Sequence, residues 1–189
     1  PIPIIEHADV KRMLLAQKSY TEGAIALCLY ANHLIDRIET CADEDQRKPL
    51  QELLDLLTPI VKSWPSEFGP KANSLAIQIL GGAGYIREYP VEQLYRDNRL
   101  NPIHEGTHGI QAMDLLGRKL WQSNGLGLQT LLREIQATLQ QAAEFPDLAP
   151  YSEQLQEALL LVNATTQSVG EQLQQQGPDI GLANASAFL

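Results

Sequence analysis

The sequence predicts an all-α protein: an antiparallel up-down helix bundle with an additional helical hairpin towards its carboxy-terminal end. Three observations support this fold class. Leu, Ala, Gln and Glu are abundant while aromatic residues make up only 6% of the 189 residues, which favours helix over sheet. Apolar residues recur three or four positions apart, the spacing of one helix face. No segment alternates apolar and polar residues over a convincing strand length.

The first helix is predicted to begin near His7 or Ala8, with Asp9 in its first turn, where a negative charge opposes the helix dipole. Its apolar and small residues are three or four positions apart, so they form one buried stripe. The stripe consists of Met13, Ala16, Tyr20, Ala24, Leu27, Ala31, Leu34 and Ile38. A polar segment, residues 42–48, then separates this helix from the next.

The second helix is expected to run to about Trp64, with a kink or local adjustment at Pro59 because proline lacks a backbone N–H. Residues 64–70 contain two prolines and a glycine, so we expect a loop there, or the tilted start of a third helix. That third helix is expected to end at Leu80, before a run of glycines.

Residues 85–106 are expected to be irregular apart from a short helix at residues 91–97. A fourth helix should then run from Glu105 or Thr107 to about Gln122. After a break rich in Asn and Gly, two further apolar stripes at helical spacing are separated by prolines. We therefore divide the chain into a helical bundle, residues 1–122, and a helical extension, residues 123–189.

Charge and composition exclude several functions. The formal net charge of −9 repels phosphate backbones, so no nucleic-acid partner is expected. The apolar runs fall short of the roughly 20 residues that cross a bilayer, so no membrane partner is expected. Cys28 and Cys41 lie on one predicted helix, about 20 Å apart along its axis, too far apart for a disulfide. Free thiols fit a cytoplasmic protein, and no metal site is predicted.

Three glycines, Gly81, Gly82 and Gly84, follow the third predicted helix. They could form a helix cap followed by a turn. They could instead bring backbone N–H groups close to a phosphate. They follow a helical pattern and not a strand, so the context of a Rossmann dinucleotide-binding fingerprint is missing.

Glu105 precedes the fourth predicted helix, and its role is open on residue chemistry alone. A carboxylate at a helix amino terminus is favoured by the dipole and often only caps the helix. A glutamate on a loop can instead project into a cleft. A cleft that excludes water makes a carboxylate a useful base near neutral pH.

The stretch as a whole resembles the carboxy-terminal signature of the acyl-CoA dehydrogenases. That signature has a Gln-x-x-Gly-Gly-x-Gly-Tyr segment, a Tyr-Pro-Val-Glu stretch with a following Arg-Asp, and a Tyr-Glu-Gly-Thr motif leading into Ile-Gln. The matching residues here are 78–85, 89–97 and 104–111, in the same order and with the same spacing. The chain departs from the pattern at His104, where Tyr is usual, and at His108, where Asn, Ser or Ala is common.

The resemblance implies a flavoprotein oxidoreductase of fatty acid metabolism (β-oxidation) that uses FAD to convert an acyl-CoA to a trans-2-enoyl-CoA. Glu105 is at the position of the catalytic base that removes the α proton. The implied FAD-binding residues are Gln78, Gly81, Gly82, Thr107 and Gly109, the first three directed at the FAD of a neighbouring subunit. Gly106 and His104 are at substrate-binding positions. Arg96 and Asp97 are interpreted as a structural ion pair or loop anchor.

The resemblance also implies that the chain is part of a larger enzyme, with the first bundle helix missing and a large apolar face left exposed. Such an enzyme would form a homo-oligomer, a dimer or tetramer, and pass electrons to an electron-transfer flavoprotein. The isolated fragment is expected to be inactive. The alternative is a non-catalytic helical module for interaction or oligomerisation, in which Glu105 only caps a helix.

Overall fold

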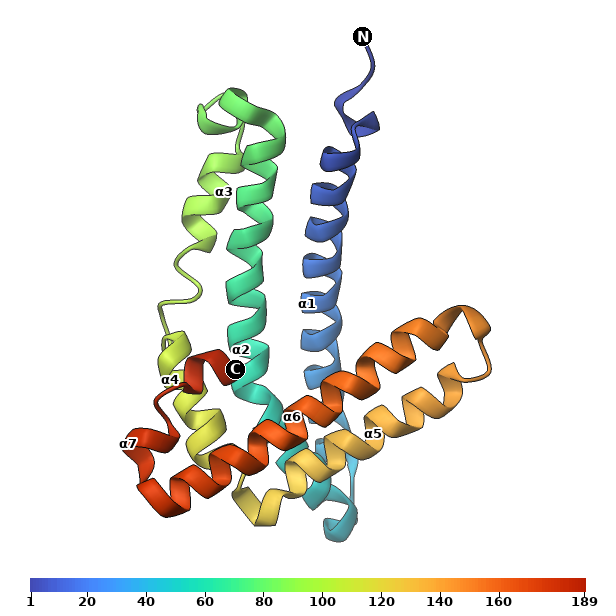
Figure 1. The fold of residues 1–189 in the computed structure, drawn as a ribbon, viewed down its shortest axis with the longest axis vertical. Coiled ribbons are helices and arrows are strands. Elements are labelled where there is room, and N and C mark those ends of the chain that lie inside the picture. Colours follow the sequence, from blue (N-terminus) through green and yellow to red (C-terminus); the bar gives the residue numbers. More distant parts are fainter. The chain divides into compact units, whose positions relative to one another are not determined.

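The computed structural model describes all 189 residues and consists of helices joined by short turns (Figure 1). It confirms the all-α class and the carboxy-terminal helical hairpin predicted from the sequence. The elements are η1 (Ile4–Glu6), α1 (Ala8–Thr40), α2 (Glu44–Leu80), η2 (Gly81–Tyr85), α3 (Val91–Asn98), α4 (His108–Asp114), η3 (Leu115–Lys119), η4 (Gln122–Gly125), α5 (Leu126–Ala142), η5 (Pro146–Leu148), α6 (Ala149–Gln176), α7 (Pro178–Gly181) and α8 (Ala185–Phe188).

The chain forms two compact units, each built from two separate segments of the sequence. The first unit contains residues 1–39 and 57–111, and the second contains residues 40–56 and 112–189. None of the helices combines the length and the apolar composition that crossing a membrane would require. Both cysteines are free, as their spacing predicted.

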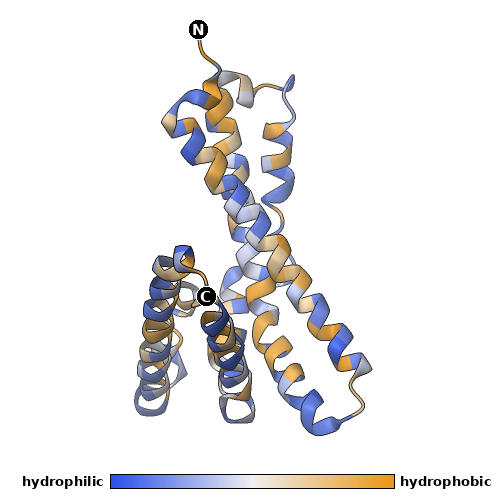
Figure 2. Cartoon of the chain, turned by 90° about the vertical axis from the view of Figure 1, so that its right-hand side faces the viewer, coloured by the Kyte–Doolittle hydropathy of each residue, from blue (hydrophilic) through white to orange (hydrophobic).

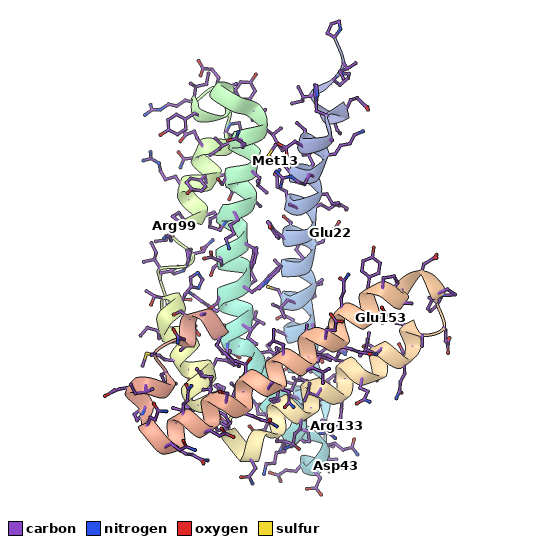
Figure 3. All side chains as sticks on the ribbon, viewed as in Figure 1. Met13, Glu22, Asp43, Arg99, Arg133 and Glu153 are labelled. Atoms are coloured by element: carbon purple, nitrogen blue, oxygen red, sulfur yellow. The ribbon has the colours of Figure 1, made fainter.

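The apolar stripe of α1 is confirmed, since none of its predicted members is exposed and Met13, Ala31 and Leu34 are buried. Met13 points from α1 towards α2 (Figure 3). Further along the same helix, the rings of Tyr20 and Phe68 lie 4.8 Å apart between centroids. This face of α1 therefore packs on the part of α2 that belongs to the first unit.

The prediction of a loop at residues 64–70 is wrong, because α2 runs without interruption from Glu44 to Leu80. An interior proline costs a helix roughly 3 kcal/mol, so packing must compensate. The buried face of α2 continues through the expected loop at helical spacing of four, three and four. Its members just before and within the expected loop are Pro59, Ser63, Ser66 and Pro70. Burial of this face against its neighbours overrides the local preference of proline.

The short helix predicted at residues 91–97 is confirmed as α3. The fourth predicted helix is confirmed only in part, because α4 ends at Asp114 and the chain continues as a π-helical turn, η3. The wider turn adds one residue, which lets Leu115, Leu116 and Leu120 all lie buried. Trp121 closes the turn by donating from its indole Nε1 to the carbonyl of Leu116 at 2.6 Å.

In the second unit, α5 and α6 form the predicted hairpin. Hydrophobic and hydrophilic residues alternate in bands along the helices (Figure 2). Two glycines set close approaches here. A Cβ on Gly127 would lie 2.5 Å from the carbonyl oxygen of Glu52, and one on Gly170 would lie 3.0 Å from the ring of Trp121. These positions let α5 and α6 pack directly against backbone and ring.

Candidate functional site

Glu105 lies in an irregular segment between α3 and α4 and has a left-handed backbone, with φ of 54°. Gly106, which follows, also has positive φ, at 91°. A residue other than glycine in this region is strained, and such strain is concentrated at functional sites. We call residues 104–107 the Glu105 loop.

The polar groups of Glu105 divide into those used by the chain and those left free. Its carbonyl accepts a hydrogen bond from Nε2 of Gln111 at 3.1 Å. Its backbone N–H has no acceptor, and its exposed carboxylate forms no hydrogen bond or ion pair. The carboxylate therefore does not cap α4. It remains available to accept a proton from a bound molecule.

Two contacts from α2 hold the Glu105 loop and the start of α4. The half-buried Lys62 donates from Nζ to the carbonyl of Gly106. Five residues further along α2, Glu67 accepts at Oε2 from Nε2 of His108 at 2.9 Å. Both contacts link residues that are more than 40 positions apart in the sequence, so α2 serves as the scaffold for the loop.

Gly106 is required at its position for two reasons. Its positive φ is unfavourable for any residue with a Cβ. A Cβ there would also lie 2.9 Å from Nε2 of Gln111 and 3.3 Å from Cγ2 of Ile110. The glycine thus permits the loop to fold tightly against the first turns of α4.

Glu67 is the charged centre of the contact with α4. Its carboxylate also pairs with Nζ of Lys71 at 3.0 Å. The hydrogen bond from Lys71 is the largest cause that holds the pKa of Glu67 below its usual value of 4.5. Burial opposes it, and the charges of Lys71 and His108 and the hydrogen bond from His108 lower the pKa further. Glu67 is therefore ionised at neutral pH.

The glycine run at the end of α2 forms the 3₁₀ turn η2. Its glycines differ in backbone φ and in the space that a Cβ would have. Gly81 has a φ of 59°, and Gly84 would place a Cβ 2.7 Å from the carbonyl oxygen of Ile77. Gly82 has neither a positive φ nor any atom within 4 Å of its Cβ position. The exposed Gln78, one turn earlier, has a carboxamide with no partner in the chain.

The predicted site residues form two separate groups. One group, with Glu105, Gly106, Thr107 and Gly109, lies beside the middle of α2, while Gln78, Gly81 and Gly82 lie at its end (Figure 1). From Glu67 to Gln78 the helix rises by about 16 Å at 1.5 Å per residue. The chain therefore does not bring all of the predicted FAD-binding residues around one point.

The remaining predicted residues lie on either side of Glu105. His104 is exposed, and its Nδ1 lies 3.2 Å from the carbonyl oxygen of Leu100. Thr107 is exposed, its hydroxyl has no partner, and its carbonyl accepts from the backbone N–H of Gln111 at 3.0 Å. Gly109 is half-buried in the first turn of α4.

Sequence reasoning missed the roles of Lys62, Glu67 and Gln111 at this site. Neither Lys62 nor Glu67 belongs to the motifs that predicted the site. The only signal for the second contact was His108, an imidazole where the family commonly has a smaller side chain. Helical spacing does not reveal partners on a helix some 40 residues away.

The chain belongs to the acyl-CoA dehydrogenase family, since residues 2–121 match the model of the acyl-CoA dehydrogenase C-terminal domain. The match confirms the resemblance that the sequence motifs indicated. It contains the Glu105 loop, α2 and the glycine turn, and it ends before the helical hairpin begins.

Several curated relatives are acyl-CoA dehydrogenases. The chain is 42% identical over 137 residues to the 3-methylmercaptopropionyl-CoA dehydrogenase of Ruegeria pomeroyi, covering 72% of this chain and 23% of that enzyme. It is 35% identical to the broad-specificity linear acyl-CoA dehydrogenase FadE5 of Mycobacterium tuberculosis, covering 71% and 22%. It is 36% identical to a butyryl-CoA dehydrogenase of Syntrophomonas wolfei, again covering 71% and 22%.

The chain spans less than a quarter of the length of these relatives. Among solved structures, Bd2924 in its apo form matches with a TM-score of 0.62 and 24% identity. That match covers 97% of this chain and 33% of the other. At this identity the likeness shows the fold alone, and it extends over the hairpin as well as the bundle.

Proposed function

We propose that this chain is the carboxy-terminal part of an FAD-dependent acyl-CoA dehydrogenase in which Glu105 is the catalytic base. The observation that carries the proposal is the state of Glu105. Its strained backbone presents a carboxylate and an N–H that the chain leaves unpaired, while its own carbonyl and that of Gly106 are both held.

In the proposed reaction the carboxylate of Glu105 removes a proton from the α carbon of an acyl-CoA thioester. FAD, when bound, would accept the hydride that leaves the β carbon, so the products are a trans-2-enoyl-CoA and reduced flavin. An α proton of a thioester is weakly acidic, so donors to the thioester carbonyl must stabilise the developing enolate. The free N–H of Glu105 is suited to be one such donor. Gly106 and His104 are proposed to contact the substrate.

The residues proposed to hold FAD fit a large flat group with polar edges. Packing within this chain does not explain why residue 82 is a glycine, because a Cβ on Gly82 would have no atom within 4 Å. The unpaired carboxamide of Gln78 and hydroxyl of Thr107 can hydrogen-bond to a ligand. Because the two groups lie far apart along α2, we propose that Gln78, Gly81 and Gly82 contact the FAD of a neighbouring subunit, while Thr107 and Gly109 contact the FAD near Glu105.

We further propose a homo-oligomer, a dimer or tetramer, with an electron-transfer flavoprotein as electron acceptor. Residues 123–189 are proposed to form a helical extension that contributes an interaction surface and belongs to the second compact unit. Helix α6 supports this, because Tyr151, Leu155 and Val162 lie at helical spacing on one face of it and are 68%, 38% and 43% exposed. Large apolar side chains at such exposure mark a surface that another protein covers. The extension is the part of the chain to which the alternative, a non-catalytic module, applies best.

The test of the catalytic proposal uses the full-length gene product, supplied with FAD and assayed with a redox dye. The substrates would be butyryl-CoA and 3-methylmercaptopropionyl-CoA. Glu105→Gln keeps the size of the side chain and removes the base, so kcat should fall by about 10²–10⁴-fold, the usual contribution of general base catalysis. FAD content should be unchanged.

Glu39→Gln is the matched control, because Glu39 is also exposed and has no partner in the chain. This variant should keep wild-type activity. If Glu105→Gln retains full activity on both substrates, Glu105 is not the base and the proposal is wrong. The isolated chain, purified from cells, is expected to be colourless and inactive, and a yellow active preparation would contradict that part of the proposal.

A further inference from the structure

The Glu105 loop is a segment that should not hold its shape unaided. Two consecutive residues, Glu105 and Gly106, have positive φ, and the second is a glycine with wide conformational freedom. The contact from Gln111 is local, only six residues away. A rigid Glu105 therefore needs support from outside the segment.

Of the two contacts that come from α2, the one with Lys62 is nearer to Glu105, since the carbonyl that it binds belongs to the next residue. The ammonium group is half-buried on α2 and forms no ion pair with any carboxylate of the chain. A partly buried charge without a counter-ion is unfavourable unless its hydrogen bonds compensate. Its one hydrogen bond goes to the Gly106 carbonyl, so the position of this lysine is coupled to the conformation of the loop.

Most other lysines of the chain behave differently. Lys71 and Lys119 pair with Glu67 and Asp55, and the exposed Lys18 pairs with Glu22. An ion pair with a nearby carboxylate explains each of these, whereas Lys62 ends on a neutral carbonyl. The contrast indicates that Lys62 serves the loop and not a charge balance on the surface of α2.

We propose that Lys62 is a positioning residue for Glu105: by holding the Gly106 carbonyl it fixes the left-handed turn that presents the Glu105 carboxylate and N–H. The Glu67–His108 contact supports the same turn from the first residue of α4. This inference rests on the proposed function, because positioning matters only if Glu105 acts on a substrate.

The test compares Lys62→Met with Lys62→Arg in the full-length, FAD-loaded enzyme. Methionine keeps the length of the stem and removes the donor, while arginine keeps a cationic donor. For Lys62→Met we expect kcat with butyryl-CoA to fall by roughly 10–100-fold, because small misplacements of a reacting group cost this much. KM should change by less than about 3-fold, and Lys62→Arg should recover most of kcat.

A second measurement does not depend on turnover. The backbone N–H of Gln111 donates to Thr107 in the first turn of α4. Loss of the Lys62 anchor should loosen that turn, so its amide should exchange with deuterium several-fold faster in Lys62→Met. Lys18→Met, which removes an exposed lysine on α1, should change neither exchange nor kcat. If Lys62→Met does not fold, Lys62→Gln gives the same comparison with a polar head group.

Unchanged exchange at Gln111 and unchanged kcat in Lys62→Met, beside an inactive Glu105→Gln, would overturn the positioning role alone. A fall in kcat that is accompanied by lower Tm and lower FAD content, and that Lys62→Arg does not recover, would also overturn the positioning role. That result would indicate that Lys62 is purely structural. Full activity of Glu105→Gln would overturn the proposed function, and this inference with it.

Discussion

The Glu105 loop and the glycine turn η2 both contain positive-φ residues and both carry predicted FAD contacts, yet the chain treats them differently. The loop is tied to α2 and α4 by side chains of Lys62, Gln111 and His108. At Gly81 and Gly82, a Cβ would have no neighbour within 4 Å. The Glu105 loop is therefore held by contacts within the chain, whereas the backbone at Gly81 and Gly82 is open to an approaching group.

On the proposed function, this difference matches what each segment would require. A reacting group must be placed accurately before substrate arrives, so its loop is anchored in advance. A backbone surface that only has to admit a flat group needs space above all, and glycine provides it. A substitution at Gly106 should therefore lower kcat/KM, whereas one at Gly82 should lower the affinity for FAD.

Among the substitutions that test this comparison, the largest effect is expected for Gly106→Ala. The φ of 91° at Gly106 is unfavourable for alanine. The new Cβ would lie only 2.9 Å from Nε2 of Gln111, so this nitrogen would have to move and its hydrogen bond to the Glu105 carbonyl would weaken. In the full-length enzyme kcat/KM should fall on the order of 100-fold. Steady-state kinetics with butyryl-CoA would check this, and wild-type kinetics would show that the turn tolerates a side chain.

The next effect separates two neighbours in the glycine turn. Gly84→Ala would bring a Cβ within 2.7 Å of the Ile77 carbonyl oxygen and 2.9 Å of its Cα, both backbone atoms that cannot move freely. Such overpacking should cost about 1–3 kcal/mol of unfolding free energy. Gly82→Ala is the control and should be neutral. Urea unfolding of both variants decides the matter, and equal midpoints would show that Gly84 is not packed.

Gly82→Leu should have a smaller effect than Gly84→Ala, and it should change the affinity for FAD and not the stability of the fold. The open space admits the side chain, so stability of the FAD-free protein should not change. If FAD or a neighbouring subunit approaches this backbone, the affinity for FAD should fall by roughly 10-fold, which corresponds to about 1.4 kcal/mol of binding free energy. Fluorescence titration of the apoenzyme with FAD measures this. Unchanged affinity would mean that nothing approaches Gly82.

The smallest effect concerns Glu67. Its pKa in the folded protein is lowered from 4.5 by Lys71 and His108, so its ionised form stabilises the fold above pH 4.5. That contribution is lost as the pH falls through the lowered value. Because the side chain is 45% exposed, Glu67→Gln should cost under about 1 kcal/mol at pH 7. Urea midpoints at pH 7 and pH 3 would test this: a gap between wild type and variant that does not narrow in acid would contradict it.

The fold was most predictable from the sequence where the pattern of a single helix decides which residues are buried. The stripe on α1 was predictable because burial repeats every three or four residues along one element. The prediction failed at residues 64–70, where Pro65 and Pro70 suggested a loop while α2 continues. Proline reports a local cost, but the buried face that overrides it depends on neighbours that a single sequence does not reveal.

The candidate site was predictable from its motif and not from its contacts. Glu105 and Gly106 were named because their residue types and spacing match a family, and the structure adds their left-handed backbone. Lys62 and Glu67 meet the loop across more than 40 residues. No local pattern encodes that meeting, since it depends on which face of α2 turns towards α4.

The placement of the two tryptophans gives each compact unit its own optical reporter. Trp64 lies in the first unit, against the ring of Phe68 at 4.7 Å, and Trp121 lies in the second, against Gly170. Variants that keep only one indole would emit from one unit at a time. Their fluorescence during denaturation would reveal whether the segment that carries Glu105 melts together with the hairpin or before it.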